Sequence, residues 1–413
     1  MKKVFTYSLV LQLAVICIFS YAQEKTFVLK LKNNASIDRI DAYVQIDFAN
    51  LVKKHKGLTQ DGFILKDGGK EIPFQILPAE GKKKELCFVI DIKSRETKKI
   101  TCIYGGNTAP GKFKNRTYAE LAVKKNGRPD GKKVRGAEYE NIQFSRVPSW
   151  HTDHDGLYKY EGPGWESERV GYRFYLDWRN ATDIFGKKVA ELVLKNVGIK
   201  DTIADNNESF HTMQPWGMDI FKVGNSLGVG SFGMWMNDKV NMVSKTDSIT
   251  CAITANGPVL SRIKTNYYGW LVGDRKYDAE SELTIAAGSR LTKNSIKISA
   301  YAGNIVTGLA KYAGTNFIKG EAATGWSYIA LYGRQSLADD NLGIALFYKV
   351  KDLIGSGDDA LSYYVMLKPA GGNAEYYFGA AWEKEAGGIK SESEFKKYLE
   401  HIISELNNPV SVE

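Results

Sequence analysis

The residues best suited to chemistry lie in a stretch of alternating polar and apolar side chains, Trp165 to Asn180. If this stretch forms one β-strand, alternate side chains share a face and stand about 6.6 Å apart. One face is then apolar, and the other carries cations with a phenol and a carboxylate: Arg169, Arg173, Tyr175, Asp177 and Arg179. On a concave face such a row predicts a site for anionic sugar groups, because guanidinium pairs with carboxylate or sulfate through two hydrogen bonds. On an outer face it is ordinary solvated surface, and both interpretations stay open.

A polar cluster and a tryptophan upstream of this row could also contact a ligand. His151, Asp153, His154 and Asp155 could ligate a metal, but they lie in an apparent loop with no further ligand in view. A solvated loop is therefore favoured, and no metal or other cofactor is predicted, while His154 is kept as a substrate contact. Trp165 is either a stacking platform for a sugar or a core residue, and the sequence does not decide between them.

A second segment, Ser209 to Trp235, is rich in glycine and aromatic residues around His211 and Asp219. It matches neither a phosphate-binding P-loop nor a dinucleotide fingerprint. A single histidine is often only a hydrogen-bonded structural residue. The nearby Trp216 and Lys222 favour a functional interpretation, in which His211 transfers protons and Asp219 and its neighbours bind substrate.

These segments must be positioned by a mainly β fold, since the chain has 40 Gly, 10 Pro and 12% aromatic residues. Its length of 413 residues predicts two domains. Short strand-like runs separated by turn residues predict an immunoglobulin-like β-sandwich over residues 23–112, with a glycine-containing linker at 105–114. Residues 116–413 are expected to form a large antiparallel β-sandwich that carries the site.

One helix is expected near the C-terminus. Ser391 and Glu394 form a capping box, and Pro409 ends the segment. Apolar residues recur at helical spacing between these limits: Phe395, Tyr398, Leu399, Ile402, Ile403 and Leu406. This stripe predicts a helix packed on the sandwich.

Residues 1–22 read as a secretory signal peptide, with a basic start, an apolar stretch and small residues before the expected cleavage point. The protein is therefore expected in the periplasm or outside the cell, with no membrane span. The remaining cysteines could pair in part, but buried free thiols are favoured: Cys87, Cys102 and Cys251. The net charge of +9 is scattered, which disfavours nucleic acid and leaves an acidic oligosaccharide as the expected partner.

The two segments resemble a known family at specific positions. Trp165-Glu166-x-x-Arg169 and Tyr172-Arg173-x-Tyr175 are similar to its tryptophan-glutamate signature, although Ser167 and Glu168 replace an asparagine and an aspartate. Phe210-His211 and Gly217-Met218-Asp219-x-x-Lys222 resemble its second block. Gly379-Ala380-Ala381-Trp382 continues the similarity. The chain is thus identified as a member of domain-of-unknown-function family 4861, whose genes lie among polysaccharide-degrading genes.

The resemblance implies a galactose-mutarotase-like sandwich and an activity. The family branch with an assigned activity, the ulvan oligosaccharide dehydratases, removes water from a non-reducing-end glucuronate or iduronate and leaves a 4,5-unsaturated end. Arg169 and Arg173 are then expected to hold the carboxylate, with His211 and Tyr175 as acid and base in either order. Trp165, Glu166, Trp216, Asp219, Lys222 and His154 are expected to bind substrate. A chain-cleaving lyase and a non-catalytic sugar-binding protein remain alternatives.

Overall fold

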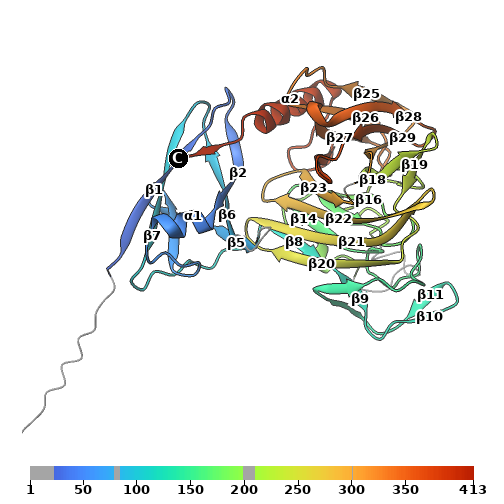
Figure 1. Ribbon diagram of the computed structural model, residues 1–413, viewed down its shortest axis with the longest axis horizontal. Helices are drawn as coiled ribbons and strands as arrows, with labels where there is room; N and C mark the ends of the chain where they lie inside the picture. The colour runs from blue at the N-terminus through green and yellow to red at the C-terminus, as the bar shows by residue number, and fades with distance from the viewer. Residues whose placement is uncertain (1–22, 79–83, 199–209, 300) are drawn as a thin grey trace, which may run out of the picture.

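The computed structural model describes residues 23–78, 84–198, 210–299 and 301–413. The expected signal peptide, residues 1–22, lies outside these ranges. Antiparallel sheets make up most of the described chain, and the predicted mainly β class is confirmed (Figure 1). Among the described residues, no helix is long and apolar enough to cross a membrane.

The N-terminal part is a two-sheet sandwich with its own apolar core. The first sheet has the order β31–β1–β7–β3–β4 and the second the order β2–β6–β5. The strand bounds are β1 (Lys25–Lys32), β2 (Arg39–Asp47), β3 (Phe63–Asp67), β4 (Lys70–Ile72), β5 (Phe74–Pro78), β6 (Lys84–Ile92), β7 (Thr97–Tyr104) and β31 (Ser411–Val412). The strand-like runs expected between residues 24 and 110 form strands, but the run expected over Glu71–Leu77 is divided into β4 and β5, which belong to different sheets. Between β2 and β3 the structure adds a short helix that was not predicted, α1 (Phe48–Lys54), which begins where the Asp47 side chain accepts a hydrogen bond from Asn50 N–H.

The larger part is built on a nine-stranded antiparallel sheet. Its order is β13–β20–β21–β22–β23–β30–β27–β26–β25. The bounds are β13 (Phe144–Arg146), β20 (Ser248–Asn256), β21 (Leu260–Val272), β22 (Arg275–Ala286), β23 (Leu291–Ile298), β25 (Thr315–Lys319), β26 (Trp326–Arg334), β27 (Asn341–Lys349) and β30 (Asn373–Trp382).

Two five-stranded sheets cover one face of the nine-stranded sheet, and the main apolar core lies between these layers. The first has the order β17–β16–β15–β14–β8: β8 (Thr117–Glu120), β14 (Gly164–Ser167), β15 (Gly171–Phe174), β16 (Thr182–Lys187) and β17 (Gly217–Asp219). The second has the order β19–β18–β24–β29–β28: β18 (Val229–Met236), β19 (Lys239–Met242), β24 (Ile305–Ala310), β28 (Leu353–Asp358) and β29 (Ser362–Leu367). The chain between β8 and β13 forms two small two-stranded sheets: β9 (Ala122–Lys124) with β12 (Tyr139–Asn141), and β10 (Arg128–Asp130) with β11 (Lys133–Arg135).

The predicted C-terminal helix, α2 (Glu392–Asn407), packs on the opposite face of the nine-stranded sheet, against β26 and β27. Ser391 caps it, since its hydroxyl oxygen accepts from Glu394 N–H at 3.2 Å. Phe395, Leu399 and Ile402 are buried against the sheet, as their helical spacing predicted. After α2 the chain crosses back to the N-terminal sandwich, where β31 joins the edge of β1 (Figure 1).

The segment Trp165 to Asn180 was expected to form one strand, and this expectation is wrong. It forms two strands, β14 and β15, with a turn between them and a loop after them. Ser167 makes the turn: its N–H donates to the Val170 carbonyl, and its hydroxyl oxygen accepts from Arg169 N–H. The side chains therefore do not alternate across one continuous strand. Arg169 precedes β15, whereas Tyr175 to Arg179 belong to the loop that follows it.

Candidate functional site

Three neighbouring strands bring the charged residues of the two segments together. β15 pairs with β16 so that Arg173 lies opposite Asp183, and β16 pairs with β17 so that Phe185 lies opposite Asp219. Residues two apart on a strand share a face. The side chains of Arg173, Asp183 and Asp219 therefore point to the same side of this sheet.

Arg173 joins the two carboxylates directly. Its Nη2 lies 2.7 Å from Asp183 Oδ2 and 2.5 Å from Asp219 Oδ2, and its Nε donates to Asp183 at 3.0 Å. The Tyr175 hydroxyl also donates to Asp183. All four side chains are buried. Arg173 Nη1 has no hydrogen-bond partner among the described residues, so one donor of the guanidinium is unused there.

His211 lies where this buried cluster meets solvent. Its Nδ1 is 3.4 Å from Asp219 Oδ2, and its side chain is 45% exposed whereas that of Asp219 is 3% exposed. The Asp219 N–H donates to the Phe210 carbonyl, which fixes the backbone beside the histidine. A buried carboxylate beside Nδ1 can stabilise a protonated imidazole, which suits a histidine to proton transfer.

Burial and the neighbouring charges shift the pKa values of Asp183, Tyr175 and Arg173. Burial, reinforced by the charge of Asp219, raises the pKa of Asp183 to about 7. Burial also raises the pKa of the Tyr175 hydroxyl, which therefore stays protonated at neutral pH. Burial opposes the charge of Arg173, but the surrounding acidic groups outweigh it and raise its pKa. Because one guanidinium carries a single charge for two carboxylates, burial and the charge of Asp219 favour protonation of Asp183 near neutral pH.

The Tyr175 ring connects this cluster to a second one in the same loop. The guanidinium carbons of Arg173 and Arg179 lie 5.0 and 3.8 Å from the ring centroid. Arg179 in turn pairs with Asp177, Glu161 and Asp153. The two clusters therefore form one continuous polar region around the β15–β16 loop.

The loop over residues 151–155 has one buried histidine and one exposed histidine. His151 is fully buried and pairs through Nδ1 with Asp155 at 2.8 Å, which is a structural contact. His154 is 55% exposed and contacts Asp153, with its Nε2 at 3.8 Å from Glu161. One ligand atom from each of Asp153, His154 and Glu161 lies within 4.8 Å of the others, a spacing that a divalent ion could bridge. Arg179 already supplies a cation to both carboxylates.

Two predicted sugar contacts are wrong because the side chains are inside the sheet layers. Trp165 is 1% exposed, and its Nε1 donates to Thr292 Oγ1 at 2.9 Å, so its ring has no surface for stacking. Glu166 is fully buried and accepts from Lys187 Nζ at 2.7 Å. Its oxygens also accept from the N–H groups of Val193 and Leu194. Trp165 and Glu166 hold the sheet and the following segment together.

The other predicted residues lie at different distances from the cluster. Arg169 lines a cavity of about 510 Å³ with residues of the N-terminal sandwich, at the far end of β15 from Tyr175. It is therefore not placed with Arg173 on one row, because Arg169 lies within the turn that precedes β15. Trp216 is half-buried, with its ring centroid 6.2 Å from that of Phe185. Lys222 is exposed three residues after Asp219, and its carbonyl accepts from the Tyr312 hydroxyl.

One residue of the cluster, Asp183, and one tyrosine whose pKa responds to the cluster's charge were not predicted. Asp183 lies in β16, a buried strand of mixed polarity, and only the register of β15 against β16 reveals that it faces Arg173. Tyr312 comes from a distant segment, and burial raises its pKa to about 12, with the charges of Asp183 and Asp219 adding to the effect. No strand was predicted over residues 182–187, so the sequence held no clear signal for Asp183.

Comparison with known proteins identifies the family. Solved structures that match include a protein in the glycosyl hydrolase family 38 from Enterococcus faecalis, with a TM-score of 0.44, 9% identity, and coverage of 94% of this chain and 47% of that chain. An alpha-mannosidase from Enterococcus faecalis V583 matches with a TM-score of 0.44, 10% identity, and coverage of 94% and 46%. The chain thus spans about half the length of these two structures. No curated protein matches it. The model for Domain of unknown function (DUF4861) matches residues 31–412, and the chain therefore belongs to this family.

Proposed function

We propose that this protein removes water from the non-reducing-end glucuronate or iduronate of ulvan-type acidic sulfated oligosaccharides, and leaves a 4,5-unsaturated end. The observation that carries the proposal is the half-exposed His211, whose imidazole is held by the buried Asp219. The sequence resemblance supports the substrate class. The periplasm or the exterior of the cell is the proposed location, from the expected signal peptide.

The reaction needs a base at C5 and a proton for the hydroxyl that leaves C4. His211 takes the C5 proton at Nε2, while Asp219 stabilises the imidazolium through Nδ1. The electrons of the C–H bond form the C4=C5 double bond, and the C4 hydroxyl leaves as water once it is protonated. Lys222 is exposed and follows Asp219 by three residues in the sequence. It is suited to stabilise negative charge that develops on the uronate carboxylate.

The buried residues act through Asp219 and do not contact the sugar. Arg173 is already paired with two carboxylates, so it does not clamp the substrate as first expected but fixes Asp219. Tyr175 is 4% exposed and donates to Asp183, which makes it a positioning residue too. Solvent-facing groups are left to supply the proton at C4.

The test uses ulvan oligosaccharides, ultraviolet absorbance of the conjugated product, and mass spectrometry. His211→Ala is expected to lower kcat by about 100- to 10,000-fold. His401→Ala is the matched control, since His401 is 41% exposed on α2 and pairs with Glu405. Retention of activity by His211→Ala within a few-fold would exclude His211 as the base.

The products separate the proposal from its alternatives. Loss of one water without shortening of the chain supports dehydration. New, shorter unsaturated chains would show a chain-cleaving lyase instead. Binding without any rise in absorbance, over a panel of ulvan, alginate, pectin and glycosaminoglycan oligomers, would show a non-catalytic binding protein.

A further inference from the structure

The loop after β15 presents one large aromatic ring to solvent. Trp178 is 46% exposed, while Asp177, Arg179 and Asn180 beside it are 3%, 9% and 2% exposed. Tryptophan is seldom left this exposed without a partner, because burial of the indole is strongly favourable.

The exposure of Trp178 does not come from a loose loop. Asn180 N–H and its side-chain amide both donate to the Asp177 carbonyl, and the amide also donates to the Val243 carbonyl. The loop closes where Tyr175 N–H donates to the Ala181 carbonyl at 2.9 Å. The indole is therefore held in place by a fixed backbone, which reduces the entropy lost when a ligand binds.

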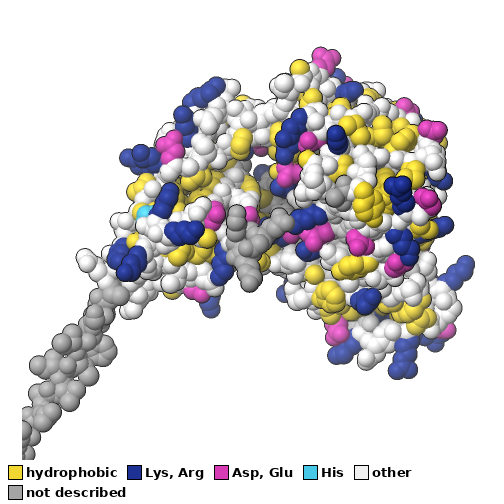
Figure 2. Space-filling model, viewed as in Figure 1, with side chains coloured by type: hydrophobic (Ala, Val, Ile, Leu, Met, Phe, Trp, Pro, Cys, Tyr) yellow, Lys and Arg dark blue, Asp and Glu magenta, His cyan; other side chains and the backbone are white. Residues whose placement is uncertain are grey.

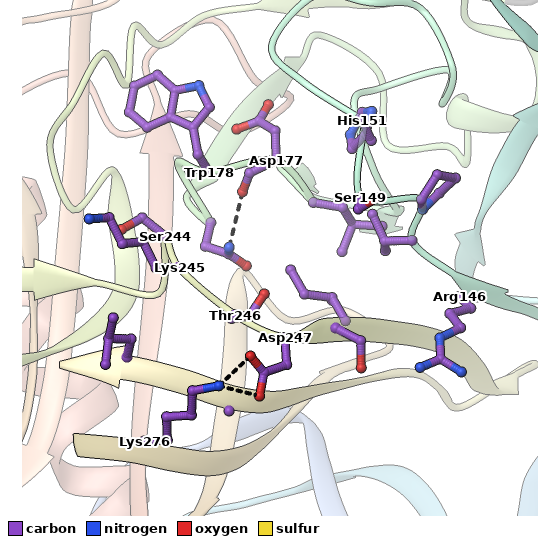
Figure 3. A pocket seen from close by; sticks show the side chains of 18 residues that line it. Arg146, Ser149, His151, Asp177, Trp178, Ser244, Lys245, Thr246, Asp247 and Lys276 are labelled. Atoms are coloured by element: carbon purple, nitrogen blue, oxygen red, sulfur yellow. Dashed lines mark hydrogen bonds and ion pairs between the residues drawn. The ribbon is translucent and has the colours of Figure 1, made fainter. Parts of the chain in front are cut away.

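Two hollows meet at this ring. One has a volume of about 820 Å³ and the other about 480 Å³, and both are lined by Trp178, Ser244, Lys245 and Leu271. Figure 3 shows the first, with Trp178 and Lys245 on one side and Arg146 on the other. Hydroxyl groups line it as well: Ser149, Thr246 and Ser248.

The charge around the ring is positive. Arg146 and Lys245 line the first hollow, and Lys239 and Lys245 line the second. No ion pair joins any of these three side chains to another residue in the described part of the chain. Lys276, in contrast, is neutralised by Asp247 at 2.6 Å. Unpaired cations around an aromatic face favour an anionic ligand with an apolar side.

We propose that Trp178, with Arg146, Lys239 and Lys245, binds the body of an anionic sugar chain while its end lies at the His211 cluster. The C–H face of a pyranose stacks on the negative face of the indole, and the cations pair with carboxylates or sulfates on either side. The geometry links the two sites, because Arg179 lines the second hollow and contacts the Tyr175 ring. The orientation of the sugar, with its non-reducing end at the His211 cluster, rests on the proposed function. The binding of an anionic sugar at Trp178 does not.

The first test measures binding, without catalysis. Affinity electrophoresis and calorimetry use ulvan, chondroitin sulfate and a neutral glucan as probes. Trp178→Ala is expected to weaken binding to the acidic polymers by about tenfold or more, and Lys245→Glu to weaken it further and reduce its dependence on salt. Trp150→Ala is the matched control, since Trp150 is 42% exposed and lines neither hollow. Unchanged binding by Trp178→Ala, or equal weakening by Trp150→Ala, would overturn the proposal.

The remaining outcomes separate this inference from the proposed function. Equal retention of the wild-type protein by single-stranded DNA, unaffected by Trp178→Ala, would show non-specific attraction and overturn the sugar site. If the acidic polymers bind through Trp178 but no unsaturated product forms, the binding site stands and dehydration is refuted. If product forms and Trp178→Ala leaves KM for a hexasaccharide unchanged, dehydration stands and this inference is refuted.

Discussion

Replacing Lys187 with methionine should strongly destabilise the protein. Lys187 and Glu166 are both fully buried, with Nζ and Oε2 2.7 Å apart. Burial lowers the pKa of Lys187 and raises that of Glu166, so each depends on the other for its charge. Removing one partner of a buried ion pair typically costs about 3–5 kcal/mol, because the remaining charge is uncompensated. Lys187→Met is expected to lower the free energy of unfolding by that amount at pH 7.

A second change should restore most of the loss. In Glu166→Gln/Lys187→Met no charge remains, and the glutamine oxygen can still accept from Val193 and Leu194 N–H, as Glu166 does. We expect the double variant to unfold within about 1–2 kcal/mol of the wild type. If it folds and keeps the wild-type KM for substrate, Glu166 has a structural role.

The stability loss caused by Lys187→Met should depend on pH, in a direction set by Glu166. The folded-state pKa of Glu166 is raised, so its contribution to stability is fully present below its unfolded pKa of about 4.3 and is lost as the pH rises toward the folded value. The penalty of Lys187→Met should therefore shrink as the pH falls from neutral toward 5. Urea unfolding followed by tryptophan fluorescence measures both effects.

An exposed ion pair is the control. Arg334 and Asp339 are 63% and 86% exposed, and Arg334→Ala should cost about 1 kcal/mol or less. A Lys187→Met variant as stable as Arg334→Ala would refute the buried-pair reasoning. So would a double variant that is no more stable than the single one.

Three further predictions concern other features. Gly217→Ala should destabilise by about 3 kcal/mol or more and lower activity, because φ is +138° and the new Cβ would lie 1.8 Å from the Gly186 carbonyl oxygen; unfolding curves and kcat measure this, and a neutral substitution contradicts it. Ser391→Ala should cost about 1 kcal/mol through loss of the α2 cap, measured by urea unfolding against Ser391→Thr as the conservative control. Burial raises the pKa of three thiols, which should react with a disulfide reagent only after unfolding: Cys87 and Cys102 to about 11 and 12, and Cys251 to about 12. Rapid reaction in the native state would contradict this burial.

The sequence predicted the elements whose signals are local. The strands of the N-terminal sandwich have turn residues between them, and α2 has both a cap and an apolar stripe. The expectation of free, buried thiols is confirmed as well. By contrast, β31 has only two residues and pairs with β1 from the other end of the chain, so no local pattern could indicate it. α1 was missed for a similar reason, since it has only seven residues.

The candidate site was predicted in part. His211, Arg173, Tyr175 and Asp219 do come together, although they were chosen partly from a family resemblance. The turn from Ser167 to Val170 contains no Gly, Pro or Asn, and without that signal Arg169 was placed on the same strand face as Arg173. The positive charge was correctly expected to be scattered: Figure 2 shows Lys and Arg interspersed with acidic and apolar side chains on the face in view.

The return of the chain to its first strand has a mechanical consequence. The N-terminal sandwich is attached to the larger part both by the segment after β7 and by the segment after α2. At the second attachment, Glu413 N–H donates to the Lys30 carbonyl, and Lys30 N–H donates to the Glu413 carbonyl. A cut in either connecting segment leaves the other connection intact, so the two parts stay at high local concentration. When the cut lies between β7 and β8, separation of the two parts also requires β31 to peel away from β1.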